Sequence, residues 1–378
     1  MINPVSILEA ADHLTSEVKR LVDIFVSPDG AGRRYLFGRN EHSAALSRVI
    51  DIDGFVDDYS GQGMIWNGKP VVESSAVPRE AIVVNCVMCN MPVTAAKKIQ
   101  ELEIFGALAY SDLCHVLPDL IPLPNFVFET RSDLLKNLKK WQNLRSSLSD
   151  DPSRQILDDL LSFRLTGNYA SMTSYSFRPT DQYFEDFLGL GSKDIFVDAG
   201  GFDGDTTEEF CKRYPGYEKV YFFEPSSSNC KKARIRLKEC RSIEFIELGL
   251  SDSVGRLWFN PDGGAASSIS ESGSCQIDVT TLDRHVDKKT TFIKMDLEGW
   301  EIKALKGAKQ HIIEDYPKLA IAVYHNASDF WGIFEFVISL RQDYKIFLRH
   351  YTEGWSETIM YFVPEQPTAV RVNVLELL

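Results

Sequence analysis

A turn rich in glycine and aspartate is the first group of residues that could do chemistry. Residues 198–207 read DAGGFDGDTT and directly follow an apolar segment. Gly200, Gly201 and Gly204 lack side chains, so a ligand can approach the backbone closely there. A phosphate-binding turn would offer lysine and free N–H groups. This turn instead carries three carboxylates, which favours a cationic ligand. We expect Asp205 to cap the helix that the turn opens.

Glu224 extends this site. It ends a second apolar segment, 24 residues after Gly200, where an acidic side chain can accept hydrogen bonds from both hydroxyls of a ribose. Together the two features predict a cofactor with a ribose and a positive charge but no pyrophosphate, and S-adenosylmethionine fits that description. NAD is an alternative, because Ala199, Gly201 and Gly204 partly match its fingerprint. A purely structural turn is another.

The second chemical group is the segment KMDLEGWE at 294–301. Methyl transfer to oxygen is an in-line displacement that also removes one proton, so it needs groups that align the acceptor and take that proton. Asp296 is expected to touch the sulfonium or the acceptor hydroxyl. His325, after a buried apolar segment, is our candidate for the base, since the ordinary pKa of histidine lies near neutral pH. His350 is a second candidate. Each could instead be a hydrogen-bonded structural residue near a strand end.

Two further interpretations of this region stay open. Our main prediction assigns no metal ligand, but Asp296, Glu298 and His325 could instead hold a divalent ion that acidifies a hydroxyl. Four aromatic residues either line an acceptor pocket or pack in the core: Trp300, Trp331, Tyr351 and Trp355.

The elements that must position these groups are strands that alternate with helices. From residue 193 onward the expected strands are 194–200, 219–224, 243–249, 291–296, 318–325, 344–350 and 357–363. Helical patterns separate most of them, and the last two should pair as a hairpin. The pattern predicts a doubly wound, mixed seven-stranded sheet.

The first third of the chain predicts a smaller Rossmann-like unit. We divide the chain into an N-terminal helix (1–30), this unit (31–125), a helical connector (126–190) and a second α/β domain (191–378). Expected strands of the unit are 33–38, 53–57, 69–73, 81–87 and 106–113, with helices at 41–49 and 93–104. Its first turn has only one glycine, so it lacks the dinucleotide fingerprint. It could still face a ligand, and a structural or oligomerising role is equally open.

Composition excludes several classes of protein. The chain has 378 residues, 41 basic against 54 acidic, and a net charge of −13, which disfavours nucleic acid as a partner. No apolar run reaches the ~20 residues of a membrane span. The first residues lack the basic segment and apolar core of a signal peptide, so we expect a cytoplasmic protein. Seven scattered cysteines indicate reduced thiols, and we interpret Cys86 and Cys89 as buried residues at a strand end rather than a metal or redox pair.

Several ordered motifs resemble one family. FVDAGGFDGDTT, YFFEP, ELGLSD, TTLDRHV, FIKMDLEGWEIKALKGA, LAIAVYHN and FLRHY…WSETIMYFV, between about 193 and 363, are similar to the FkbM family of S-adenosylmethionine-dependent methyltransferases. The resemblance implies a class I methyltransferase fold, preceded here by the smaller Rossmann-like domain and the connector. It also implies O-methylation of a hydroxyl on a saccharide or secondary metabolite.

The resemblance also implies roles for individual residues. The methionine moiety of the cofactor would lie against the turn, the ribose against Glu224 and the adenine against the segment after the third strand. The cofactor-binding residues are then Asp198, Gly200, Gly201, Asp203, Asp205, Thr206, Glu224, Leu250, Ser251, Asp252 and Asp296. The alternatives are a non-catalytic cofactor-binding or scaffold protein and a nicotinamide-dependent oxidoreductase. The acceptor would be a small molecule or a saccharide, and the sequence leaves homo-oligomer formation open.

Overall fold

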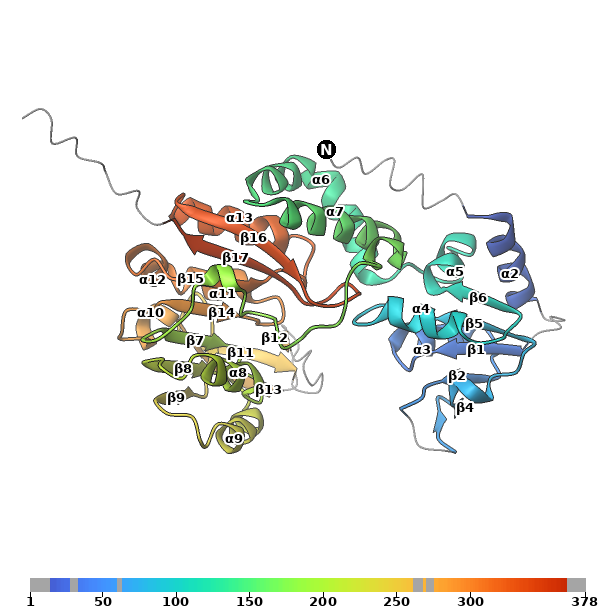
Figure 1. Ribbon diagram of the computed structural model, residues 1–378, viewed down its shortest axis with the longest axis horizontal. Coiled ribbons are helices and arrows are strands. Elements are labelled where there is room, and N and C mark those ends of the chain that lie inside the picture. The colour runs from blue at the N-terminus through green and yellow to red at the C-terminus, as the bar shows by residue number, and fades with distance from the viewer. Residues whose placement is uncertain (1–13, 28–32, 60–62, 261–267, 270–274, 366–378) are drawn as a thin grey trace, which may run out of the picture.

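The chain folds around two separate α/β sheets. The computed structural model describes residues 14–27, 33–59, 63–260, 268–269 and 275–365. A six-stranded sheet and a seven-stranded sheet lie at opposite ends of the molecule, and two long helices lie between them along one side (Figure 1). No helix in the described ranges is long and apolar enough to cross a membrane. The division into domains proposed from the sequence stays a prediction.

The first sheet has the strand order β3-β4-β2-β1-β5-β6. Its strands are β1 (Arg33–Phe37), β2 (Gly54–Val56), β3 (Ile65–Trp66), β4 (Lys69–Val72), β5 (Ala81–Asn85) and β6 (Gly106–Ala109). All pairs are parallel except β3 with β4. The helices around it are α2 (Ser16–Val26), α3 (Glu41–Val49), α4 (Pro92–Gln100) and α5 (Tyr110–Val116). The start of the expected N-terminal helix (1–30) lies outside the described residues.

The expected strand 106–113 is wrong in its second half. The strand ends at Ala109 and the chain continues as α5. The Asp112 carboxylate accepts the Ala109 N–H at 2.7 Å, which satisfies a donor at the start of the new helix. Tyr110 and Leu113 are buried one turn apart, so the same apolar residues that suggested a strand also form the inner face of this helix.

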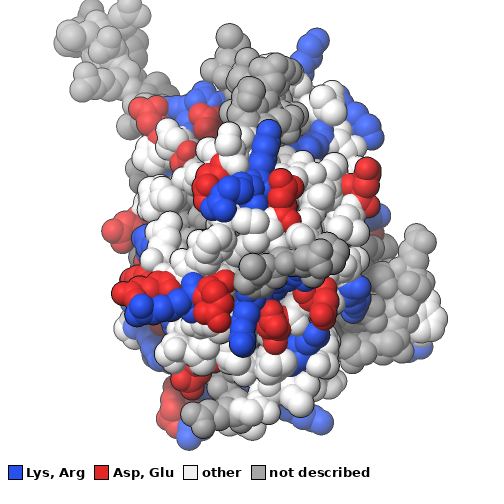
Figure 2. All heavy atoms as spheres, turned by 90° about the vertical axis from the view of Figure 1, so that its right-hand side faces the viewer, with Lys and Arg blue, Asp and Glu red and all other residues white. Residues whose placement is uncertain are grey.

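The face of the molecule at the end of the six-stranded sheet carries both signs of charge. Lysines and arginines lie next to acidic residues over its described surface (Figure 2). Ion pairs around the same sheet join Arg79 to Glu103 and Lys98 to Asp58. Such alternation disperses the field of the individual charges.

The connector forms two helices, α6 (Asn125–Ser147) and α7 (Asp151–Thr166), and the sequence pair Asp151-Pro152, which is typical of a helix start, lies directly after the break. Asp150 caps α7 by accepting the Ser153 N–H at 2.9 Å. The start of α7 also covers the edge strand of the second sheet, because the Leu348 N–H donates to Ser153 Oγ and Arg349 pairs with Asp150 at 2.7 Å. The connector is therefore packed against the second sheet rather than free in solvent.

The second sheet has the order β16-β17-β15-β14-β7-β8-β9 and is mixed, as predicted. Strands β7, β8, β9, β14 and β15 run parallel. In the hairpin, β17 pairs antiparallel to β15, and β16 pairs antiparallel to β17 at the edge of the sheet. The strands are β7 (Ile195–Ala199), β8 (Lys219–Phe223), β9 (Ile243–Ile246), β14 (Phe292–Met295), β15 (Lys318–Ala322), β16 (Tyr344–His350) and β17 (Thr358–Pro364). The helices are α8 (Asp205–Arg213), α9 (Ser227–Arg236), α10 (Leu282–His285), α11 (Glu301–Lys306), α12 (Lys309–Glu314) and α13 (Asp329–Leu340).

Two features around the seven-stranded sheet differ from expectation. The helix expected after the fourth strand divides at Gly307, where a Cβ would lie 2.0 Å from the Ser251 carbonyl oxygen. A small third sheet of order β10-β13-β11-β12 follows β9. Its strands are β10 (Gly249–Leu250), β11 (Gly255–Asn260), β12 (Ser268–Ile269) and β13 (Cys275–Thr280). Most of the segment between β11 and β13, residues 261–274, lies outside the described residues.

Candidate active site

A cavity of about 640 Å³ opens at the carboxyl ends of β7, β8, β14 and β15. Parallel strands direct their carboxyl ends to one edge of a sheet, which is where open α/β sheets bind ligands. Gly200, Glu224, Asp296 and Tyr324 follow these four strands, and all four residues line the cavity. The two sequence-predicted groups therefore meet in one site.

The turn after β7 needs both of its first two glycines. Gly200 has φ +79°, and a Cβ there would lie 2.0 Å from the Asp296 carbonyl oxygen. A Cβ on Gly201 would lie 2.2 Å from the Phe222 ring. Both N–H groups donate to the Phe223 carbonyl, so the turn folds back over the end of β8. Only Gly200 lines the cavity, and Gly201 is a packing requirement of the turn.

Glu224 is almost fully buried, with its carboxylate at the cavity. Oε2 accepts the Phe202 N–H at 3.0 Å, and Oε1 accepts the Ser226 N–H at 2.8 Å. Burial raises the pKa of Glu224, against the effect of these N–H donors. Oε2 has a second lone pair for a ligand hydroxyl, and Oε1 could accept another in place of its long hydrogen bond of 3.4 Å from Asn229 Nδ2.

Asp198 lies beneath the turn rather than in the cavity. It is fully buried, accepts a hydrogen bond from the Thr207 hydroxyl at 2.6 Å and pairs with Lys294 at 3.0 Å. The Lys294 ammonium also donates to the Gly200 carbonyl at 2.7 Å. Burial opposes its charge, but Asp198 and Asp296 outweigh burial and raise the pKa of Lys294. The ion pair therefore holds the turn against β14.

Two predictions for the end of this turn need correction. Asp203 faces away from the cavity and pairs with Arg236 at 2.7 Å. Asp205 does not cap α8: Gly204, with φ +89°, occupies the N-cap, and Asp205 Oδ1 accepts the N–H of Thr206 instead. Asp205 and Thr206 do line the cavity, as predicted. The left-handed backbone of Gly204 therefore places the N-cap of α8 one residue earlier than the sequence analysis expected.

The predicted adenine segment is only partly at the cavity. Leu250 lines it. Ser251 accepts a hydrogen bond from Trp300 Nε1 at 3.3 Å, and Asp252 pairs with Lys303 at 3.0 Å, so both side chains are engaged with the segment after β14. Neither is among the residues that line the cavity.

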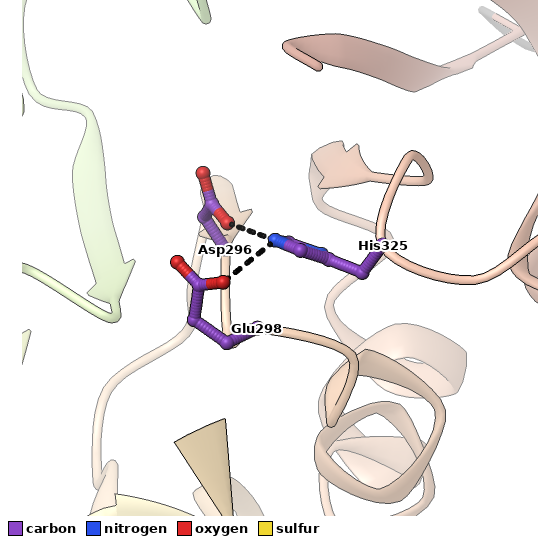
Figure 3. A group of neighbouring side chains, drawn as sticks. All are labelled: Asp296, Glu298 and His325. Carbon is purple, nitrogen blue, oxygen red and sulfur yellow. Dashed lines mark ion pairs between the residues drawn. The ribbon is translucent and has the colours of Figure 1, made fainter. Parts of the chain in front are cut away.

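The acidic end of the cavity is built around Asp296. The Tyr183 hydroxyl donates to Asp296 Oδ2 at 2.7 Å, and His325 Nε2 lies 3.4 Å from Asp296 Oδ1 and 3.3 Å from Glu298 Oε2 (Figure 3). His325 Nδ1 lies 3.2 Å from Glu301 Oε1. Burial opposes protonation of the ring, but the carboxylates outweigh it and raise the pKa of His325 well above its ordinary value. A base at neutral pH needs a neutral ring, so this arrangement disfavours the role that the sequence suggested.

His350 is not at the cavity. It ends β16 and is buried, with Nδ1 2.9 Å from Thr358 Oγ1 and the Tyr175 ring packed edge-on at 5.3 Å. Burial lowers the pKa of His350 to about 3. Because β17 separates β16 from β15 in the sheet, this histidine lies two strands from His325. The structure removes it from the catalytic candidates.

Of the four aromatic residues that could either line an acceptor pocket or pack in the core, two lie at the cavity and two in the core. Trp300 and Trp355 line the cavity. Trp331 donates from Nε1 to Asp133 at 2.9 Å and Tyr351 is fully buried, so these two belong to the core.

The sequence analysis missed two sets of cavity residues. One set comes from the end of the connector segment and from loops of the second sheet, and comprises Gln182, Tyr183, Tyr324 and Glu357. Burial, reinforced by the charge of Asp296, raises the pKa of Glu357 to about 7. The other set comes from the first unit and comprises Glu41, Cys89 and Asn90. Glu41 is the first residue of α3, directly after the turn that follows β1, and this position near the end of a parallel strand was the available signal.

The loop between β16 and β17 holds the first unit at the cavity. The Glu353 carboxylate accepts the Thr94 N–H at 2.7 Å and the Thr94 hydroxyl at 2.6 Å. The Glu353 N–H donates to the Asn90 carbonyl at 2.8 Å, and Ser356 Oγ donates to Asn90 Oδ1 at 3.0 Å. These contacts bring residues that are more than 250 positions apart in the sequence together at one wall of the cavity.

Comparisons with known proteins agree with this architecture. Residues 198–347 match the methyltransferase FkbM domain. None of the curated proteins matches the sequence. The solved structure of methyltransferase FkbM from Methylobacillus flagellatus KT is similar over 95% of this chain and 100% of its own, with a TM-score of 0.73 and 24% identity. A putative methyltransferase from Streptococcus mutans, solved in complex with SAH, covers 47% of this chain with 93% of its own, at a TM-score of 0.32 and 17% identity. The first likeness spans both sheets and shows the fold of the whole chain.

Proposed function

Because the chain contains an FkbM methyltransferase domain at residues 198–347 on a class I methyltransferase fold, we propose that it transfers a methyl group from S-adenosylmethionine to a hydroxyl of a saccharide or secondary metabolite. The observation that carries this proposal is the cavity, which joins Glu224 at the end of β8 to the acidic group around Asp296 at the end of β14. One end suits a ribose, and the other suits the reacting groups.

The charge of the cavity supports this cofactor over NAD. Among the described residues that line it, Lys294 is the one lysine or arginine, and its ammonium is already bonded to Asp198 and the Gly200 carbonyl. The lining carboxylates are those of Glu41, Asp205, Glu224, Asp296, Glu298 and Glu357. The amino group and sulfonium of S-adenosylmethionine are cationic, so carboxylates attract them. The pyrophosphate of NAD would meet the same carboxylates with unfavourable charge.

The rest of the cavity suits an uncharged acceptor with hydroxyl groups. Phe177, Tyr324 and Trp355 offer aromatic faces, against which the apolar faces of sugars can stack. Asn90 and Glu41 add polar groups from the first unit. Transfer forms a bond from the acceptor oxygen to the methyl carbon and breaks the carbon–sulfur bond, while the hydroxyl proton leaves. We assign its removal to the acidic group around Asp296, with the fixed geometry of the site aligning donor and acceptor.

Calorimetric titration of the full chain with S-adenosylmethionine, S-adenosylhomocysteine and NAD tests the cofactor. We expect both adenosyl compounds to bind and NAD to give no signal. Binding of NAD without binding of S-adenosylmethionine would overturn the proposal in favour of an oxidoreductase.

Transfer to oxygen is tested with methyl-labelled S-adenosylmethionine and a panel of saccharides and hydroxylated metabolites. We expect label in a product that survives mild alkali, because methyl ethers resist the base that hydrolyses methyl esters. Cofactor binding without transfer to any hydroxyl compound would favour the alternative of a non-catalytic binding protein.

A further inference from the structure

Three donor atoms converge at the end of β14, from two acidic residues and one histidine. We propose that Asp296, Glu298 and His325 form a binding site for one divalent cation, of the class that accepts mixed oxygen and nitrogen ligands, such as Mn²⁺. Figure 3 shows the imidazole directed between the two carboxylates.

The spacing of the three donors fits one ion. His325 Nε2 lies 3.4 Å from Asp296 Oδ1 and 3.3 Å from Glu298 Oε2, and one atom from each residue lies within 4.8 Å of the others. Adjacent ligands of an octahedral ion with bonds of about 2.1 Å are about 3 Å apart. The two distances from His325 Nε2 are close to that spacing.

The histidine is buried and directed at the two acidic residues. Its side chain is 9% exposed, and neither ring nitrogen makes a hydrogen bond within the described part of the chain. The neighbouring carboxylate oxygens lie at ion-pair distances only. A buried polar atom without a hydrogen bond costs about 1–3 kcal/mol, so native structures rarely keep one without a partner. A cation between Nε2 and the two carboxylates supplies that partner.

Glu301 lies at ion-pair distance from the other ring nitrogen of His325, where it favours the ring orientation that a metal ligand needs. It is fully buried, and its Oε1 lies 3.2 Å from His325 Nδ1 while accepting the Leu297 N–H at 2.7 Å. A carboxylate on one ring nitrogen leaves the other nitrogen directed at the ion, which is the common arrangement around metal-bound histidines. Glu301 is therefore a positioning residue rather than a ligand.

The chain between the two acidic ligands is folded to bring them together. Glu298 has φ +53° and Gly299 has φ +90°, both in the left-handed region that non-glycine residues seldom adopt. A Cβ on Gly299 would lie 2.8 Å from Asn326 Nδ2. This turn places two carboxylates on the same side although the residues are only two positions apart.

A bound cation has a direct use if the proposed function holds. An alcohol that coordinates a divalent cation loses its proton more readily, so the ion would assist the acceptor hydroxyl. This consequence rests on the proposed methyl transfer, whereas the binding of the ion does not.

The test is a titration of the full chain with Mn²⁺ after treatment with a chelator, in which electron paramagnetic resonance measures the free ion. We expect one Mn²⁺ bound per chain. His325→Gln and Glu298→Gln should each weaken binding at least tenfold, and Glu301→Gln should weaken it by a smaller factor. His311→Gln is the matched control, because His311 also pairs with a carboxylate, Asp315, but outside the cavity.

Binding of no Mn²⁺ by the wild-type chain would overturn the inference, and so would equal binding by wild type and Glu298→Gln. Circular dichroism of each variant shows whether it folds. If His325→Gln does not fold, Glu298→Gln still decides the test, because the Glu298 side chain is more exposed than that of His325. The S-adenosylmethionine titration is separate. Cofactor binding without Mn²⁺ binding overturns this inference alone, whereas Mn²⁺ binding without cofactor binding overturns the proposed function alone.

Discussion

Replacement of Glu224 by glutamine tests the ribose assignment with the smallest change in shape. In the structure Glu224 Oε2 accepts the Phe202 N–H, and Oε1 accepts the Ser226 N–H and a long hydrogen bond of 3.4 Å from Asn229 Nδ2, which a ribose hydroxyl could replace. Glutamine replaces one oxygen by an NH₂ donor, so one of the two N–H groups loses its acceptor. The hydrogen bonds to the ribose also change from charge-assisted to neutral.

The expected loss follows from those bonds. A hydrogen bond to a charged group contributes about 1.5–3 kcal/mol and a neutral one about 0.5–1.5 kcal/mol. For two ribose hydroxyls the difference is about 2–3 kcal/mol, which corresponds to roughly a 30- to 150-fold rise in Kd. Calorimetric titration with S-adenosylhomocysteine measures it, because this compound carries the same ribose and does not react.

The control for this change is Glu247→Gln. Its carboxylate bonds to Ser227 and Arg234 on the surface after β9, outside the cavity. We expect its Kd to equal that of the wild type. Thermal unfolding of both variants separates a loss of affinity from a loss of fold, since the Phe202 and Ser226 N–H groups also belong to the native structure. A Glu224→Gln protein that folds and binds with the wild-type Kd would refute the assigned role.

Three further predictions address the rest of the molecule. Asp296→Asn should lower turnover by about 10²–10⁴-fold with a nearly unchanged cofactor Kd, as measured by label transfer and calorimetry; a loss confined to cofactor affinity would contradict the role at the acceptor. Burial lowers the pKa of His350 from 6.5 to about 3 in the folded chain. As the pH falls below 6.5, the unfolded chain therefore binds a proton that the folded chain does not, and the free energy of unfolding decreases until about pH 3. Between pH 7 and pH 5, the free energy of unfolding measured with urea should fall by about 2 kcal/mol more for wild type than for His350→Asn, and an equal fall in both proteins would refute this prediction. Glu353→Gln should speed amide exchange at Thr94 by roughly tenfold or more, because it weakens charge-assisted hydrogen bonds, while exchange in β7 stays unchanged.

Some of this protein was already determined by the sequence, because the relevant signals are local. Apolar segments that end in glycine or acidic residues marked the strands of the second sheet, and their shared direction placed Gly200, Glu224 and Asp296 at one edge. The pair Asp151-Pro152 similarly marked the start of α7, since a proline in the first turn of a helix acts within a few residues.

Other features were decided only by tertiary structure, because a side chain's neighbours depend on which elements pack together. Asp203 and Asp205 are two residues apart in the same turn, yet the position of Arg236 on α9 draws one of them away from the cavity. His350 and His325 both follow apolar strands, but the hairpin inserts β17 between them and buries only His350 away from the site. The wall from the first unit depends on the bond between Thr94 and Glu353, and no local pattern links residues so far apart. The meeting of His325 with Asp296 and Glu298 likewise required two neighbouring strands and a left-handed turn to act together.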